Sequence, residues 1–274
     1  MYLQKQLNDC TYYFDAHNSV YLIVGKERAA IIDTGMEKTP FIEEIRKITD
    51  LPLIVLLTHG HPDHIGRSAD FEDVYLAEED AKVYQDDFNL MPIAGKPIEE
   101  VHLFEGTPVF DLGGLTLEVI RIGGHTPGSV VYVDRKNKQI FTGDALGAGV
   151  SVWLQLPESL PVREYRENLK QFKKTLTELG FDEHWQAYSG HYLQMYRHPG
   201  YDDNPINIEM IDDAIKLCDM ALNNSVEHQP SQTQNFGVPC FEVSYRHMTF
   251  VLNDQKLERE KNEENECTQN VGCS

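Results

Sequence analysis

Three histidines and one aspartate lie within six residues of each other, at His59, His61, Asp63 and His64. They follow the apolar run Leu53–Leu57, which predicts a buried strand. In an extended segment His59 and His61 point the same way, and the turn after the intervening proline brings Asp63 and His64 round to a neighbouring position. Imidazoles and carboxylates suit zinc, manganese or iron, so this segment predicts a metal site.

Three further loops offer a metal ligand directly after a β-rich run: Gly124-His125-Thr126-Pro127-Gly128, Thr142-Gly143-Asp144 and Ser189-Gly190-His191. Loops at strand ends are where a rigid scaffold usually presents functional groups. A lone pair of histidines would be explained equally well as a surface feature. Four ligand-bearing segments favour one shared metal centre.

These loops must be positioned by strands and helices that alternate along the chain. The β-rich runs are Val20–Val24, Ala29–Asp33, Leu53–Leu57, Val74–Ala77, Leu115–Ile120, Val130–Asp134 and Gln139–Thr142, and a later pair, Cys240–Tyr245 and Met248–Leu252, reads as a hairpin. Apolar spacing predicts helices after Thr39-Pro40, over Pro161–Leu179, and from Asn204-Pro205 to Leu222. The pattern predicts helices packed on the outer faces of sheets, as a doubly wound sheet or a four-layer sandwich.

Composition and charge restrict the class of protein. The 274 residues are 41% apolar and 25% charged, which excludes collagen-like and wholly disordered classes. No apolar run approaches the ~20 residues that span a bilayer, and the first residues lack a signal peptide's apolar stretch, so we expect a cytoplasmic protein. The net charge of −20 makes nucleic acid and anionic membranes unlikely partners, and leaves the oligomeric state open.

The composition along the chain also predicts the domain boundaries. Residues 1–253 are expected to form a single domain, because no linker rich in proline, glycine or serine divides them. Residues 254–274 are strongly polar and are expected to be a disordered tail. The five cysteines form no Cys-x-x-Cys pair and are expected to be reduced thiols, with the role of Cys267 and Cys273 left open.

Together with Ile31-Ile32-Asp33-Thr34-Gly35, the four ligand segments resemble the metallo-β-lactamase superfamily in order, spacing and residue type. The resemblance implies an α/β fold, the four-layer αββα sandwich, with metals in a groove at the edge of its two sheets. It also implies the ligand sets, which are His59, His61 and His125 for the first metal, Asp63, His64 and His191 for the second, and Asp144 as the bridge. Asp33 would orient the His59–His64 loop by hydrogen bonds.

No named subfamily of this superfamily fits fully. Asp144 stands where the penicillin-hydrolysing zinc enzymes have Cys, Ser or His, which argues against antibiotic hydrolysis. Glyoxalase II looks similar at the ligands, but Gly147-Ala148-Gly149 lacks its Gly-Cys-Gly-Arg-like segment. Acyl-homoserine lactonases place a tyrosine where Gly147 stands. The substrate is therefore left as a small ester, thioester, lactone or related compound.

The expected function is a metal-dependent hydrolase that holds two divalent ions per chain, zinc first, with manganese or iron as alternatives. A metal-bridging hydroxide would be the nucleophile, and the displaced proton would pass through Asp63 or solvent. Trp153, Tyr192 and Tyr196 are expected to rim the groove and contact the small-molecule substrate. Two alternatives stay open: a single-iron enzyme similar to persulfide dioxygenases, and a metal-containing binding or sensing module without turnover.

Overall fold

The computed structural model describes residues 3–37, 42–147, 151–192, 206–231, 237–254 and 257. A seven-stranded sheet is built from the first part of the chain, with its strands in sequence order. They are β1 (Leu3–Gln6), β2 (Thr11–Asp15), β3 (Ser19–Val24), β4 (Ala29–Ile32), β5 (Leu53–Leu56), β6 (Asp73–Ala77) and β7 (His102–Phe104). Pairing is antiparallel from β1 to β4 and parallel from β4 to β7.

A second sheet has five strands in the order β13-β11-β10-β9-β8. Their bounds are β8 (Val109–Asp111), β9 (Thr116–Arg121), β10 (Val130–Asp134), β11 (Gln139–Gly143) and β13 (Gln186–Ser189). A third sheet, in the order β12-β16-β15-β14, joins β12 (Val152–Trp153) to β14 (Gln229–Pro230), β15 (Cys240–Tyr245) and β16 (Met248–Asn253). The predicted hairpin is therefore confirmed, and it also pairs with β12.

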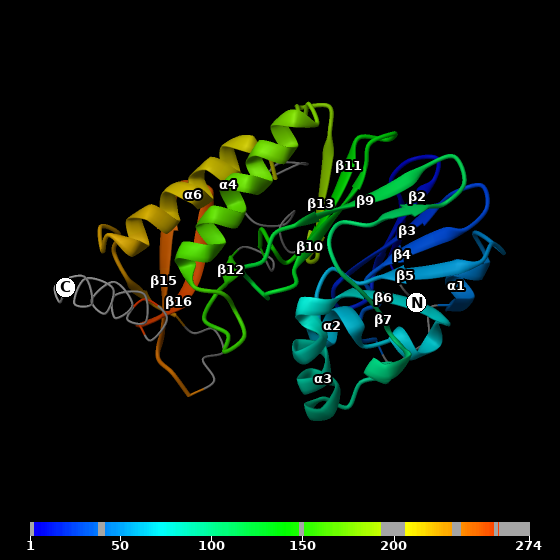
Figure 1. Cartoon of the computed structure of the whole chain (residues 1–274), viewed down its shortest axis with the longest axis horizontal. Coiled ribbons are helices and arrows are strands. Elements are labelled where there is room, and N and C mark those ends of the chain that lie inside the picture. The colour runs from blue at the N-terminus through cyan, green and yellow to red at the C-terminus, as the bar shows by residue number, and fades with distance from the viewer. Residues whose placement is uncertain are drawn as a thin grey trace, which may run out of the picture.

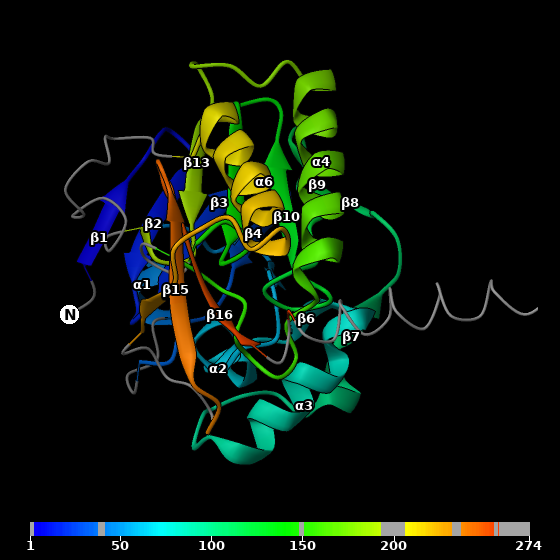
Figure 2. The ribbon, with the colours of Figure 1, turned by 90° about the vertical axis from the view of Figure 1, so that its left-hand side faces the viewer.

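Helices cover the outer faces of the two larger sheets. They are α1 (Ile42–Arg46), α2 (Pro62–Ile65), α3 (Ala81–Leu90), α4 (Val162–Glu178) and α6 (Ile208–Leu222). In Figure 1, α1, α2 and α3 lie beside the first sheet and α4 and α6 lie on the far side of the second. Figure 2, turned by 90°, shows α4 and α6 next to each other, in agreement with their many contacts.

The strands alternate their side chains between separate cores, as the two-residue period of a strand requires. Along β5, Ile54 and Leu56 enter the core between the two sheets, while Val55 enters the core beneath α1, α2 and α3. Along β10, Tyr132 enters the central core and Val131 packs toward α4 and α6. Three cores between four layers make the predicted αββα sandwich, which is confirmed.

The predicted helices are present with shifted ends. α4 runs Val162–Glu178, and Gly180 adopts the left-handed φ of 70° expected of a residue that ends a helix. α6 begins at Ile208, not at Asn204-Pro205, which lies outside the described residues. The Asn207 side chain accepts a hydrogen bond from the Met210 N–H, so Asn207 is the residue that caps α6. Thr39-Pro40 also lies outside the described residues.

The end of the described chain continues into the core. Leu257 is buried among residues of the second sheet, α6 and the third sheet, so the folded body reaches at least three residues beyond Asp254. The rest of the predicted tail lies outside the described residues. Within the described ranges, no helix is both long enough and apolar enough to cross a membrane.

Candidate metal centre

The predicted ligands lie on loops at the ends of strands from both large sheets. His59 and His61 follow β5, and Pro62 starts the short helix α2, which carries Asp63 and His64. His125 lies between β9 and β10, Asp144 follows β11, and His191 follows β13. β11 and β13 are parallel neighbours with Gly143 opposite Ser189, so the residues that follow them emerge side by side.

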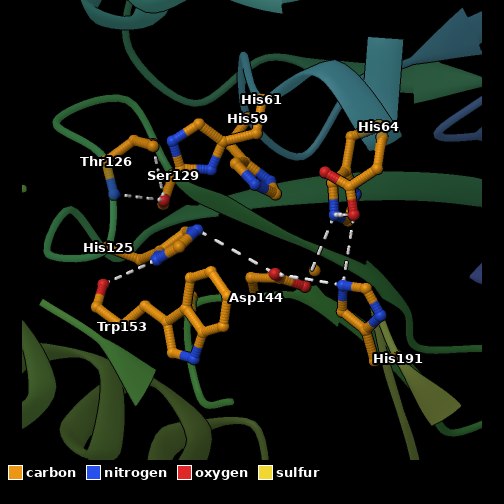
Figure 3. A network of polar contacts seen from close by, with 12 residues as sticks. His59, His61, His64, His125, Thr126, Ser129, Asp144, Trp153 and His191 are labelled. Carbon is orange, nitrogen blue, oxygen red and sulfur yellow. Dashed lines mark hydrogen bonds and ion pairs between the residues drawn. The ribbon is translucent and has the colours of Figure 1, made fainter. Parts of the chain in front are cut away.

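The structure brings all seven predicted ligand residues together. Three groups have ligand atoms within 4.8 Å of one another: His59, His61 and His125; Asp63, His64 and His191; and His59, His64 and Asp144. Asp144 lies in the middle of Figure 3, with His125 on one side and His191 on the other. This is the arrangement that the resemblance implied, two ligand sets with one carboxylate between them.

The donor atoms of these residues fit metal ions. Buried polar atoms are normally hydrogen-bonded, and those that are not require an explanation. Within the described residues, five buried atoms of this cluster have no hydrogen-bond partner: His59 Nε2, His64 Nε2, His125 Nε2, His191 Nδ1 and Asp144 Oδ1. His191 faces the cluster with its other nitrogen, Nε2, which lies 3.2 Å from Asp63 and 3.4 Å from Asp144. Imidazole nitrogens and carboxylate oxygens gathered in this way form a donor set for divalent cations such as zinc, manganese or iron.

The other nitrogen of each first-set histidine is held by a neighbour. His59 Nδ1 contacts Thr58 Oγ1 at 3.0 Å, and His125 Nδ1 donates to the Trp153 carbonyl at 2.8 Å. In His61 it is Nε2, and not Nδ1, that contacts a neighbour, because Nε2 lies 2.7 Å from Glu158 Oε1. Such partners fix the ring orientation and the tautomer of a metal-binding histidine.

Asp33 lies behind the ligands and holds their loop. Its carboxylate accepts hydrogen bonds from the Thr58 backbone N–H and the Thr58 hydroxyl, each at 2.8 Å, and contacts His64 Nδ1 at 2.8 Å. Asp33 is buried and adopts a φ of 59°, a left-handed conformation that costs most residues about 1 kcal/mol or more. These contacts are the ones by which Asp33 was expected to orient the His59–His64 loop.

The two ligand sets differ in charge when no metal is bound. Burial and, to a smaller extent, the neighbouring His61 lower the pKa of His125 to about 4. Burial also lowers the pKa of His191, but the carboxylates of Asp144 and Asp63 outweigh it and raise the value to about 10. In the first set His59 and His125 are therefore neutral imidazoles at pH 7, whereas burial lowers the pKa of His61 but the contact with Glu158 outweighs it and raises the value. The second set contains imidazolium paired with carboxylates.

Two buried or partly buried carboxylates near the centre were not predicted from the sequence. Asp80, which is fully buried, accepts hydrogen bonds from the Gly60 N–H at 2.8 Å, the Gly128 N–H at 2.6 Å and the Thr126 hydroxyl at 2.7 Å. It thus ties the His59–His64 loop to the His125 loop. Burial raises the pKa of Asp80. Glu158 is the second, through its contact with His61.

The three aromatic residues predicted to contact substrate are placed differently from one another. Trp153 is partly buried and its ring lies beside His125 and Asp144 in Figure 3. Tyr192 is 8% exposed and packs in the core between the sheets, with its ring centre 5.4 Å from that of Tyr13. Tyr196 lies outside the described residues. Of the three, Trp153 alone is placed beside the ligands among the residues that the structure describes.

Gly190 is required because the loops that carry the ligands approach each other closely at this position. A Cβ added to Gly190 would lie 2.2 Å from Asp144 Oδ1 and 2.8 Å from His64 Cε1. Real Cβ atoms do not approach so closely, and both neighbours are themselves held in the cluster. Gly190 therefore leaves the space in which Asp144 sits between the two ligand sets.

Two relatives are similar to part of this chain in sequence. The hydroxyacylglutathione hydrolase GloC of Haemophilus influenzae is 32% identical over 137 residues, which cover 45% of this chain and 64% of that protein. The acyl-coenzyme A thioesterase MBLAC2 of Gallus gallus is 27% identical over 167 residues, covering 50% of this chain and 60% of that protein. The matched stretch thus spans less than two thirds of either relative.

A solved structure agrees at the level of the fold. The metallo-β-lactamase from Pontibacter korlensis superposes with a TM-score of 0.57 at 19% identity, covering 80% of this chain and 99% of that one. The family model of the metallo-β-lactamase superfamily matches residues 14–191, well over half the chain. This match contains Asp33 and all seven ligand residues, and the chain belongs to the metallo-β-lactamase superfamily.

Proposed function

We propose that this chain is a hydrolase with two divalent metal ions that cleaves small thioesters. The observation that carries the proposal is the clustering of seven histidine and aspartate ligand residues, four of whose buried donor atoms, His59 Nε2, His64 Nε2, His125 Nε2 and Asp144 Oδ1, have no hydrogen-bond partner among the described residues. Relatives named as a hydroxyacylglutathione hydrolase and an acyl-coenzyme A thioesterase favour thioesters over the esters and lactones that the sequence left equally open.

Two bound divalent cations would make a shared water acidic enough to ionise near neutral pH, and would polarise the thioester carbonyl. Residues of this chain would hold the two ions in the positions that this reaction requires. Asp144, whose side chain is 5% exposed, sits between the two ligand sets. Asp63 is 22% exposed and lies 3.2 Å from His191 Nε2, so it is the ligand carboxylate with the better access to solvent for a proton.

The overall reaction balances without a further co-reactant. An oxygen–carbon bond forms between water and the acyl carbon, and the carbon–sulfur bond breaks with its electron pair on sulfur. The two protons of water end on the thiol and on solvent, which leaves a carboxylate and a thiol as products. No side chain needs to form a covalent intermediate, in keeping with a site built from histidine and aspartate.

Metal content and turnover test the proposal together. The purified protein, reconstituted with Zn²⁺, Mn²⁺ or Fe²⁺, should carry close to two equivalents by elemental analysis. It should hydrolyse members of a panel of thioesters faster than the matched esters and lactones, and a chelator should abolish this activity. One metal per chain would favour the single-iron alternative, and two metals without turnover would favour a binding module.

Variants at two histidines provide the matched comparison. His125→Ala removes a first-set ligand and should lower the rate by several orders of magnitude, while His102→Ala changes an exposed histidine of β7 that pairs with Asp73 at 3.4 Å. His102→Ala should leave both metal content and rate at the level of the unmodified protein. Equal rates in the His125→Ala variant and the unmodified protein would contradict the proposed mechanism.

A further inference from the structure

The segment between β12 and α4 contacts the first ligand set at several points. The Trp153 carbonyl accepts from His125 Nδ1 at 2.8 Å, and the Ser159 hydroxyl donates to the His125 carbonyl at 2.8 Å. The Glu158 carboxylate reaches His61 Nε2 at 2.7 Å. One short segment therefore supports two of the three histidines from the side away from Asp144.

This segment is itself held by the third sheet. The Leu154 N–H donates to the Val251 carbonyl at 3.0 Å, and the Asn253 side-chain amide donates to the Gln155 carbonyl at 2.8 Å. Both partners belong to β16, and the Asn253 contact is buried. Glu158 thus extends from a backbone that is fixed at two points shortly before it, instead of from a free surface loop.

His61 differs from its two neighbours in the nitrogen that is left for a metal. His59 and His125 present an unpartnered, buried Nε2. In His61 that nitrogen is occupied by Glu158, so the nitrogen available to join the set is Nδ1. The three rings lie close, with centres 4.7 Å apart for His59 and His61 and 4.6 Å apart for His61 and His125.

A neutral imidazole carries one N–H, and which nitrogen bears it is set by the hydrogen bond that the ring makes. A carboxylate can only accept, so contact with Glu158 favours the tautomer with the proton on Nε2. The lone pair is then on Nδ1, on the side of His59 and His125. The ring of His61 is 8% exposed, so it cannot exchange this partner freely for water.

We propose that Glu158 is a positioning residue for the first metal: by accepting the His61 Nε2–H it fixes the ring orientation and tautomer that present Nδ1 to the ion. The inference rests on the proposed function only in requiring that the site binds metal. Carboxylate partners of metal-binding histidines typically change metal affinity by ~10–100-fold.

Three substitutions separate this role from simple attraction between charges. Glu158→Ala removes the acceptor, Glu158→Asp keeps the charge but shortens the reach, and Glu158→Gln keeps the reach and an accepting oxygen but loses the charge. The control is Glu164→Ala, which removes a carboxylate from the exposed surface at the start of α4. Circular dichroism and melting curves first establish that each variant is folded.

The measurement is the affinity for each of two Co²⁺ ions, from competition with a chromophoric chelator, together with the visible absorption of the bound Co²⁺. Glu158→Ala and Glu158→Asp should weaken one of the two ions by ~10–100-fold and alter its absorption bands. Glu158→Gln should stay within about threefold of the unmodified protein, because its amide oxygen accepts the same N–H. The second ion and the Glu164→Ala variant should be unchanged.

Two results would overturn the proposal. Unchanged Co²⁺ affinity in Glu158→Ala would show that His61 needs no partner. A loss in Glu158→Gln as large as in Glu158→Ala would show that charge, and not the hydrogen bond, supports the site. Either result would leave the proposed function standing, whereas failure of the unmodified protein to bind two ions would contradict the proposed function itself.

Discussion

The ligand histidines do not all use the same nitrogen, and the contacts behind them determine which one is available. His64 shows this most directly, because Asp33 accepts at its Nδ1 and leaves Nε2 for the site. Asp33 also accepts from both the N–H and the hydroxyl of Thr58. A side chain in this place must therefore accept hydrogen bonds on both of its oxygens.

Asp33→Asn should consequently affect the second metal more than the first. The amide can satisfy the Thr58 N–H with its oxygen, but its NH₂ group then faces His64 Nδ1 and favours the tautomer that protonates Nε2. We expect a loss of ~10–100-fold in affinity for the second ion. Stepwise chelator competition measures both sites in the same protein, so the first ion is the internal control. An equal loss at both sites would contradict this account.

The pKa values predict how metal binding depends on pH. His191, with a pKa of about 10, is an imidazolium at pH 7, and a metal must displace its proton before binding. His125, with a pKa of about 4, is already neutral above pH ~5 and has no proton to lose. Affinity for the second ion should therefore rise more steeply with pH across the range 6–9 than affinity for the first, in which only the pKa of His61 is raised.

Calorimetric metal titrations in buffers of different ionisation enthalpy count the released protons. In the metal-free protein near pH 7, roughly two protons should leave with the ion bound at the His191 set, because the pKa values of both His64 and His191 are raised. Fewer should leave with the ion bound at the His125 set, where only the pKa of His61 is raised. Equal release at both sites would mean that the carboxylates do not keep His191 charged.

At the residue scale the sequence predicted the ligands, from local motifs and from the family resemblance, and missed the carboxylates of Glu158 and Asp80 that support them. His59, His61, Asp63 and His64 are neighbours in the chain, so their spacing alone indicates a metal site. Glu158 meets His61 only because the segment after β12 crosses back over the site, 97 residues away in sequence. The chain has many acidic residues, and nothing in the sequence around Glu158 distinguishes it from the others.

The same distinction holds for the elements. The strands with continuous apolar runs, such as β5 and β10, were predicted within a residue or so, because both of their faces are buried. β7, β8 and β14 are short or exposed, and β12 has two residues, so they give no periodic signal. β12 is a strand because β16 pairs with it, and that pairing depends on the folded C-terminal hairpin.

Asp80, at the start of α3, joins two loops that carry ligands and should contribute to stability as well as to metal binding. Asp80→Ala leaves the Gly60 and Gly128 N–H groups and the Thr126 hydroxyl without their acceptor. Unpaired buried donors cost about 1–3 kcal/mol each, partly offset here by the removal of a buried charge. We expect a loss of roughly 3 kcal/mol in the free energy of unfolding of the metal-free protein.

Urea unfolding of the metal-free protein measures this loss. Asp86→Ala is a suitable control, because Asp86 lies on α3 with its side chain exposed and forms an ion pair with the exposed Lys82. A loss of under about 0.5 kcal/mol in Asp80→Ala, similar to an ordinary surface change, would show that the two loops are held by other contacts.

The charge of the whole molecule bears on which thioesters the proposed hydrolase would accept efficiently. A net charge of −20 surrounds a centre whose own ligands include two aspartates, with Glu158 beside them. Such a field slows the approach of anionic substrates, and dissolved salt screens it with a Debye length of ~30 Å at 0.01 M and ~8 Å at 0.15 M. Added salt should therefore speed the approach of an anionic thioester to the site. Two relatives carry names that include glutathione and coenzyme A.

The last prediction follows from this field. Between ionic strengths of 0.01 and 0.15 M, kcat/KM for acetyl-coenzyme A should rise severalfold, while kcat/KM for an uncharged thioester of similar acyl group should stay within a factor of about two. The change should appear mainly in KM, because salt acts on the encounter and not on the metal-held groups. A fall in kcat/KM for the anionic thioester with added salt would instead indicate cationic side chains at the entrance that outweigh the overall charge.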